Sequence, residues 1–133
     1  MSPVVLDTSA VAAVIFGEPD AEAYAAAMAR HVGDLCISAF TRVELGIVIE
    51  AGQGPAAAHD AVAMLNRLAV TTETVDADQA EIAIAAWRRF GKGRHPAGLN
   101  LGDCFSYALA RSLGGLLLFK GNDFAQTDIA SAV

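Results

Sequence analysis

Short runs of consecutive apolar residues alternate along this chain with longer segments of helical periodicity. The runs at residues 4–6, 35–37 and 116–119 have the length of buried strands, and residues 71–75 also favour a strand. A short terminal strand is predicted after residue 127. Strands that alternate with helices usually pair in parallel, so the pattern predicts an α/β fold with a parallel sheet. The expected helices cover residues 8–16, 21–30, 39–50, 55–68, 77–90 and 101–113.

Capping residues mark several of the expected helix ends. Thr8 or Ser9 can cap the first helix, because either hydroxyl can accept a backbone N–H. Asp76, with Gln79 three residues later, resembles a capping box. Asn100 is expected to cap the last long helix after a loop at residues 91–100.

The composition describes a well-packed protein. At 133 residues the chain predicts one domain, residues 1–133, and its 54% hydrophobic and 18% charged residues exclude disorder. They favour a dense core or an extensive subunit interface. No stretch approaches the roughly 18 apolar residues of a membrane span, and no basic leader precedes the first strand. We therefore expect a cytoplasmic protein without a membrane partner.

The cysteine content and the net charge limit the kinds of site that this chain can form. Cys36 and Cys104 lie in apolar contexts and predict reduced core thiols, with one buried disulfide as the alternative. Neither has the spacing of a zinc site. The net charge of −6 argues against holding a polyanion by counterion release alone. An acidic protein that acts on phosphates needs a local basic patch or bridging metal ions.

Four carboxylates occupy unusual places. Asp7 directly follows the first strand, Glu44 lies inside an apolar helical run, Asp103 is in a helix's first turn, and Asp123 comes just after the last buried strand. Burying an ionised carboxylate is costly unless it is paired, hydrogen-bonded or metal-bound. Sites in parallel sheets form at the carboxyl ends of strands. Together the four acids predict an oxygen-rich site for Mg²⁺ or Mn²⁺, suited to phosphodiester cleavage.

Each acid also has a purely structural interpretation. Asp7 can cap the first helix, and Asp103 suits the cap geometry set by Asn100. Glu44 is predicted on the apolar face of its helix, which includes Phe40, Val43, Ile47 and Val48, but it could be a salt-bridged surface acid. Asp123 fits an ordinary turn. The four acids together support the prediction of a metal site more strongly than any one of them does alone.

A basic cluster is the second candidate site. Arg88, Arg89, Lys92 and Arg94 gather near one predicted helix end, followed by His95. They predict contacts to a phosphate backbone, with a solvated cationic helix end as the alternative. Arg111 and Lys120 could contribute.

These motifs together resemble a known family. Residues 4–10, 38–45, 99–110 and 118–124, with the ending at 127–129, are similar to the PIN-domain ribonucleases, specifically the VapC toxins of bacterial type II toxin–antitoxin systems. The resemblance implies a three-layer α/β/α fold with a central parallel sheet and a homodimer. It implies Mg²⁺- or Mn²⁺-dependent endonucleolytic cleavage of RNA, neutralised by a cognate VapB antitoxin.

The resemblance also assigns residues. It implies that Asp7, Glu44, Asp103 and Asp123 form the catalytic, metal-binding site, with Asp7 and Asp103 as direct ligands. Ser9 would support this site, with Thr8 and Asn122 beside it. Asn122 or Asp128 could take the place of Asp123.

Three other functions compete with this assignment. A receiver domain needs a phosphoacceptor Asp at the end of a mid-chain strand, where residues 35–37 lead into Ser38. A phosphatase with a nucleophilic Asp7 needs a second acid two residues on, where Ser9 stands. A catalytically inactive binding module would be distinguished by a lack of metal-dependent thermal stabilisation.

Overall fold

The apolar runs of the sequence form one parallel sheet. The computed structural model describes residues 2–133, and its strands lie in the order β3-β2-β1-β4. All three pairings are parallel. The strands are β1 (Val4–Leu6), β2 (Leu35–Ser38), β3 (Thr71–Glu73) and β4 (Leu116–Leu118). The helices are α1 (Thr8–Ile15), α2 (Ala21–Arg30), α3 (Ala39–Gln53), α4 (Pro55–Arg67), α5 (Ala77–Phe90) and α6 (Leu101–Leu113), with a 3₁₀ turn η1 (Phe124–Gln126).

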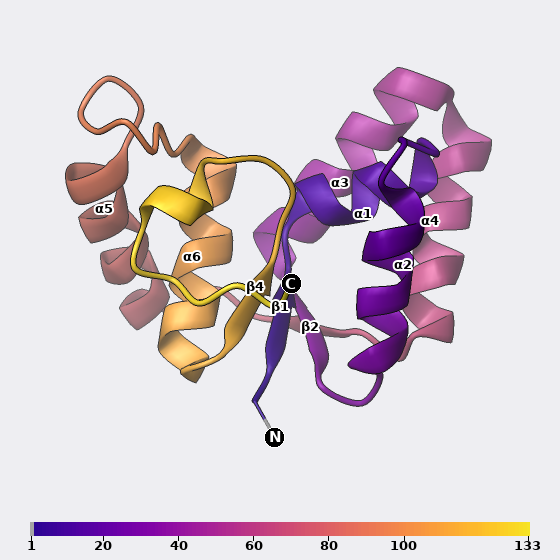
Figure 1. The fold of residues 1–133 in the computed structure, drawn as a ribbon, viewed down its shortest axis with the longest axis horizontal. Coiled ribbons are helices and arrows are strands. Elements are labelled where there is room, and N and C mark those ends of the chain that lie inside the picture. The colour runs from indigo at the N-terminus through magenta and orange to yellow at the C-terminus, as the bar shows by residue number, and fades with distance from the viewer. Residues whose placement is uncertain (1) are drawn as a thin grey trace.

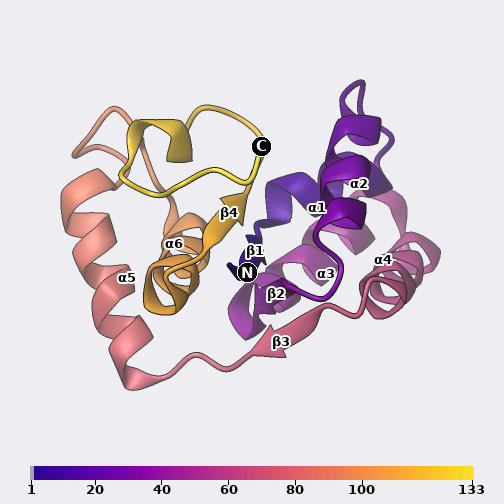
Figure 2. The same ribbon diagram turned by 60° about the horizontal axis from the view of Figure 1, so that its bottom comes forward.

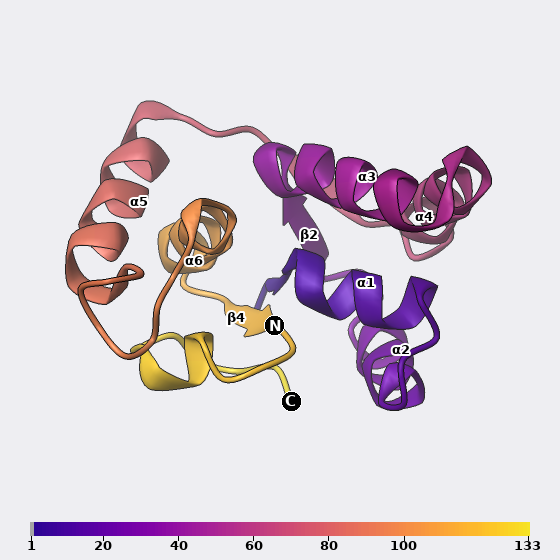
Figure 3. The ribbon, with the colours of Figure 1, turned by 90° about the horizontal axis from the view of Figure 1, so that it is seen from above.

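Helices cover both faces of the sheet (Figures 1 and 3). Successive residues of a strand point to opposite faces, so Val4 and Leu6 join the core beneath α1–α4, whereas Val5 joins the core beneath α5 and α6. The extended segment after β3 carries the chain to α5 on the other side (Figure 2). The predicted three-layer α/β/α fold is confirmed.

The strand order creates a switch point beside β1. The chain moves from β1 outwards to β2 and β3, and then returns to place β4 on the other side of β1. The Asp7 N–H donates to the Leu118 carbonyl (3.0 Å), which extends the β1–β4 pairing by one residue. Ligands of open α/β sheets bind at such reversals, outside the carboxyl ends of the strands.

Two predicted caps are corrected by the structure. Asp7, not Thr8 or Ser9, is the N-cap of α1, and its side chain accepts from the Ser9 N–H. Asp76 caps α5 through the Gln79 N–H, but the Gln79 side chain donates to the Thr74 carbonyl, so the capping box is incomplete. The segment after residue 127, which was predicted to form a short strand, forms a single β-bridge between Leu117 and Ser131.

The predicted apolar face of α3 is wrong. Val43 and Ile47 are 62% and 64% exposed, while α3 buries Thr41, Leu45 and Ile49 instead. The helix has apolar residues on two sides, and periodicity alone cannot tell a core face from an exposed one.

Two smaller predictions concern the cysteines and the lengths of the helices. Cys36 and Cys104 are free, buried thiols, and burial raises the pKa of each to about 11. Within residues 2–133, every helix is too short or too polar to cross a bilayer.

Candidate active site

A pocket of about 330 Å³ lies at the carboxyl ends of β1 and β4. The side chains of all four predicted acids line it, each from a different part of the chain. Asp7 follows β1, Glu44 is on α3, Asp103 is on α6, and Asp123 follows β4. The remaining lining residues include Thr8, Ser9, Asn100 and Lys120.

Asp7 is the most buried of the four acids, with 4% of its surface exposed. Its Oδ2 accepts hydrogen bonds from the Ser9 backbone N–H (3.1 Å) and hydroxyl (2.6 Å). Its Oδ1 accepts from the Ser106 hydroxyl at 2.7 Å. Ser9 in turn accepts from the Lys120 N–H at 3.0 Å. Asp7 therefore caps α1 and also faces the pocket, so its structural and functional interpretations are compatible.

Glu44 reaches the pocket by crossing to α6. The Thr8 hydroxyl donates to Glu44 Oε1 at 2.6 Å. The rest of the carboxylate lies against Gly102 in the first turn of α6, where a Cβ atom would overlap Glu44 Oε2. Half-buried and held from two sides, Glu44 is not a surface ion pair with Arg42, whose guanidinium instead donates to Thr72.

Asp103 completes the predicted cap of α6. The Asn100 side chain accepts from the Asp103 N–H (2.8 Å), and Asp103 Oδ2 accepts from the Asn100 N–H (3.0 Å). Burial raises the pKa of Asp103 to about 7, against the lowering effect of the Asn100 N–H. The negative charges of the three other acids raise this pKa further. Such a perturbed carboxyl in a pocket is typical of functional sites.

Asp123 and its two alternatives occupy different surroundings. Asp123 lines the pocket at the start of η1, next to the buried ring of Phe124. Asn122 is exposed and lies outside the pocket lining. Asp128 turns away from the pocket and accepts from the Tyr107 hydroxyl at 2.6 Å. This position makes Asp128 a poor substitute for Asp123 at the pocket.

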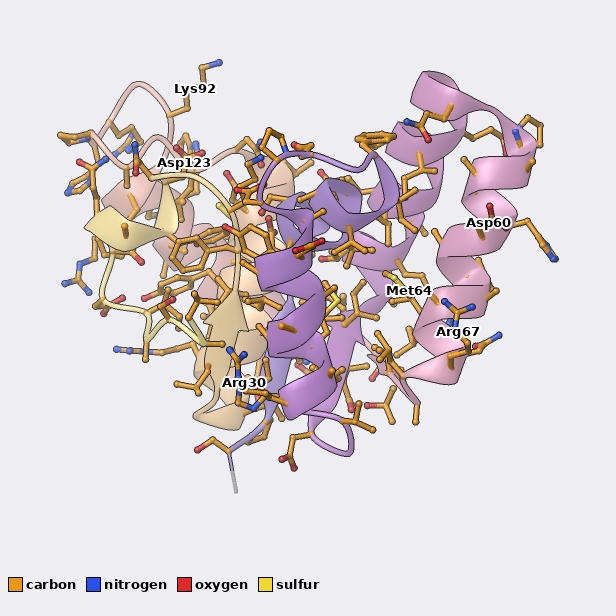
Figure 4. All side chains as sticks on the ribbon, turned by 45° about the vertical axis from the view of Figure 1, so that its right-hand side comes forward. Arg30, Asp60, Met64, Arg67, Lys92 and Asp123 are labelled. Carbon is orange, nitrogen blue, oxygen red and sulfur yellow. The ribbon has the colours of Figure 1, made fainter. Side chains whose placement is uncertain are left out.

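The basic cluster does not line the acidic pocket. Arg89 forms an ion pair with Asp128 (3.1 Å), and Arg94 lies over the Trp87 ring while donating to the Arg88 carbonyl. Lys92 lines a neighbouring apolar groove that shares Asn100 with the pocket. Figure 4 shows Lys92 projecting outwards on the same side of the molecule as Asp123.

The other two predicted basic contributors are also paired. Arg111 binds Asp128 at 3.2 Å. Lys120 lines the pocket, but its ammonium group is held by Glu18 (3.0 Å) and Asp20 (2.9 Å). The pocket itself is therefore predominantly acidic.

The donor set fits a hard divalent cation. All four groups are carboxylates, the ligands that Mg²⁺ and Mn²⁺ prefer, and an oxygen that accepts one hydrogen bond keeps a second lone pair. Within residues 2–133, no three His, Cys, Asp or Glu side chains stand close enough together to hold one ion. The fold brings the four acids to the lining of one pocket.

Sequence reasoning missed three residues of this site. Gly102 makes room for Glu44, Ser106 binds Asp7, and Thr41 lies behind Ser106. A glycine in the first turn of a predicted helix is the one local signal that was available, since glycine weakens a helix and needs a reason to be there.

Comparisons with known proteins identify the family of this chain. The family model of the PIN domain matches residues 4–130. Ribonuclease VapC30 of Mycobacterium tuberculosis is 49% identical over 129 residues, covering 96% of this chain and 97% of the relative. Ribonuclease VapC of Mycolicibacterium smegmatis is 48% identical over 128 residues, covering 96% and 98%. The chain belongs to the PIN-domain family and, within it, to the VapC ribonucleases.

Solved structures share the fold at lower identity. The crystal structure of Mycobacterium tuberculosis VapC20, described as a sarcin–ricin loop cleaving toxin, superposes with a TM-score of 0.78 at 22% identity over 96% of each chain. A toxin–antitoxin complex from Klebsiella pneumoniae gives a TM-score of 0.65 at 17% identity over 98% of each chain. At these low identities, the two solved structures show that the fold is shared.

Proposed function

We propose that residues 1–133 form a single PIN domain that acts as the toxin of a toxin–antitoxin pair, a Mg²⁺- or Mn²⁺-dependent endoribonuclease. The observation that carries the proposal is the pocket lined by Asp7, Glu44, Asp103 and Asp123, in a chain whose relatives are VapC ribonucleases. Acids from four separate segments converge there at the switch point of the sheet.

In this proposal the four carboxylates hold the metal, with Asp7 and Asp103 as the principal ligands. Bound metal would lower the pKa of an attacking water and neutralise charge on the scissile phosphate. Ser9 orients Asp7 through its hydroxyl, and Thr8 orients Glu44 in the same way. The basic residues Arg88, Arg89, Lys92 and Arg94, which are all exposed, contact the RNA backbone outside the pocket. These contacts position RNA without reading its sequence.

Cleavage of RNA by the purified chain tests this proposal. Wild type should cut RNA internally in Mg²⁺ or Mn²⁺ and stop when the metal is chelated. Asp7→Asn and Asp103→Asn should retain the fold, because an amide oxygen can still accept the capping hydrogen bonds, yet lose cleavage. Undiminished cleavage in both variants, or in chelator, would refute the assignment.

Exposed apolar side chains support protein partners. Val43 and Ile47 on α3, and Trp87 and Leu101 beside the groove between α5 and α6, are each at least 46% exposed. We propose that these surfaces serve a homodimer and a cognate VapB-type antitoxin, since contiguous exposed apolar surface marks interaction sites. Size-exclusion chromatography with light scattering, with and without the product of a neighbouring small reading frame, tests both partners.

A further inference from the structure

Two fully buried hydroxyl groups lie directly behind Asp7. Thr41 on α3 and Ser106 on α6 have no exposed surface. Ser106 Oγ is 2.7 Å from Asp7 Oδ1 and 3.3 Å from Thr41 Oγ1. A buried hydroxyl in a helix costs free energy unless it is hydrogen-bonded. The presence of two such hydroxyls beside Asp7 therefore calls for a structural or functional explanation.

The direction of the two hydrogen bonds follows from the proton count. An ionised carboxylate only accepts, so the single hydroxyl proton of Ser106 points to Asp7. Ser106 Oγ then has lone pairs left to accept, and the proton between the two hydroxyls comes from Thr41. Thr41 therefore donates to Ser106, which donates to Asp7.

This relay joins the elements that carry the acids. Thr41 lies three residues before Glu44 on α3, and Ser106 lies three residues after Asp103 on α6. Residues three apart on a helix share a face. Contact between the hydroxyls therefore fixes α3 against α6 one turn from each acid. The bond to Asp7 adds the start of α1 to the same assembly.

We propose that Thr41 and Ser106 are positioning residues of the acidic site, which together set the orientation of Asp7 and its spacing from Glu44 and Asp103. The inference rests on the proposed metal-dependent cleavage and adds to it a second support for Asp7, opposite Ser9. Partners of metal ligands orient them, and losing such a partner typically weakens metal affinity or activity about 10–100-fold.

The test measures Mn²⁺ dependence in Ser106→Ala, Thr41→Val, the double variant and the conservative Thr41→Ser. Ser106→Ala should raise both the Kd for Mn²⁺, measured by isothermal titration calorimetry, and the Mn²⁺ concentration for half-maximal RNA cleavage about tenfold or more. The KM for RNA should stay unchanged. Thr41→Val should act in the same direction, add little in the Ser106→Ala background, and be rescued in Thr41→Ser, because the two hydroxyls work in series.

Ile49→Val is the matched control for lost stability. Ile49 is equally buried on α3 but faces the core beneath α1 and α4. The Ile49→Val substitution should lower the melting temperature and leave the Mn²⁺ dependence of cleavage unchanged.

Two outcomes would overturn the inference, and they are distinguishable. If wild type cleaves RNA with Mn²⁺ and the hydroxyl variants have the same Mn²⁺ dependence, Thr41 and Ser106 serve only the fold. If wild type neither binds Mn²⁺ nor cleaves RNA, the proposed function fails and this inference fails with it.

Discussion

The Glu44 carboxylate packs directly against Gly102, in space that any side chain at position 102 would occupy. The contact joins the middle of the chain to the first turn of α6, next to Asp103. Gly102 has no positive φ, and the absence of a side chain there leaves room for the Glu44 carboxylate.

Gly102→Ala should displace Glu44 and reduce RNA cleavage at least as strongly as removing the Glu44 carboxylate does in Glu44→Gln. The added methyl group would overlap the Glu44 oxygens, whose Thr8 contact holds them in place. Initial cleavage rates, with circular dichroism to verify folding, provide the measurement.

Gly46→Ala is the matched control for this substitution. Gly46 is also helical, on α3, and a Cβ there would meet nothing within 4 Å. We expect normal cleavage and a stability gain of about 0.5–1 kcal/mol, because alanine favours a helix over glycine. Equal activity in the two alanine variants would show that Glu44 does not need its observed position.

Metal affinity should rise steeply between about pH 6 and about pH 8. The pKa of Asp103 is raised to about 7 by burial and by like charges, so the folded protein holds this proton where the unfolded chain has released it. Without metal, this group therefore lowers folding stability as the pH rises from about 4 to about 7. A cation binds the deprotonated form and reverses that loss.

The measurement is the Mn²⁺-induced shift in melting temperature across this pH range. The shift should grow through pH 7 in wild type and be smaller and less pH-dependent in Asp103→Asn. A wild-type shift of constant size would rule out Asp103 as the group that competes with the metal.

Asp128→Ala should destabilise the protein by about 1–3 kcal/mol, the range for leaving a buried polar partner unsatisfied. The carboxylate accepts from the buried Tyr107 hydroxyl and pairs with Arg89 and Arg111, so it ties the C-terminal segment to α5 and α6. Denaturant unfolding measures the change. Tyr107→Phe in the same background should add little, and full additivity would contradict the shared contact.

Lys92→Ala should weaken RNA binding evenly across sequences and reduce the salt dependence of binding by about one unit of slope. Lys92 projects from the loop after α5, on the side of the pocket (Figure 4). Arg67→Ala is the charge-matched control, since Arg67 lies on α4 in the opposite layer (Figure 4). Equal losses in both variants would mean that net charge alone governs binding.

The parallel sheet and the four acids could be predicted because their signals are local. Val4–Leu6 is an uninterrupted apolar run, and Asp7 follows it at once. The supports of those acids could not be predicted, because they depend on tertiary contacts. Nothing near Gly102 in the sequence points to Glu44, and Ser106 meets Asp7 only when α6 packs against β1.

The prediction of which face of α3 is buried was wrong for a different reason. Val43 and Ile47 follow the same periodicity as a core stripe, yet the core takes Leu45 and Ile49. A helix with two apolar sides has two possible orientations, and only its packing against α1 and α4 decides between them.

The hydrogen bonds around Asp7 also determine when the acidic pocket can form during synthesis of the chain. Asp7 leaves the ribosome about 100 residues before the Ser106 hydroxyl that binds it, and the Lys120 N–H that binds Ser9 follows later still. A nascent chain that ends at α5 also lacks Asp103, Asp123 and the β4 partner of β1. The complete pocket can therefore form only after α6, β4 and Asp123 have been made, so any ribonuclease activity must wait until these segments have left the ribosome.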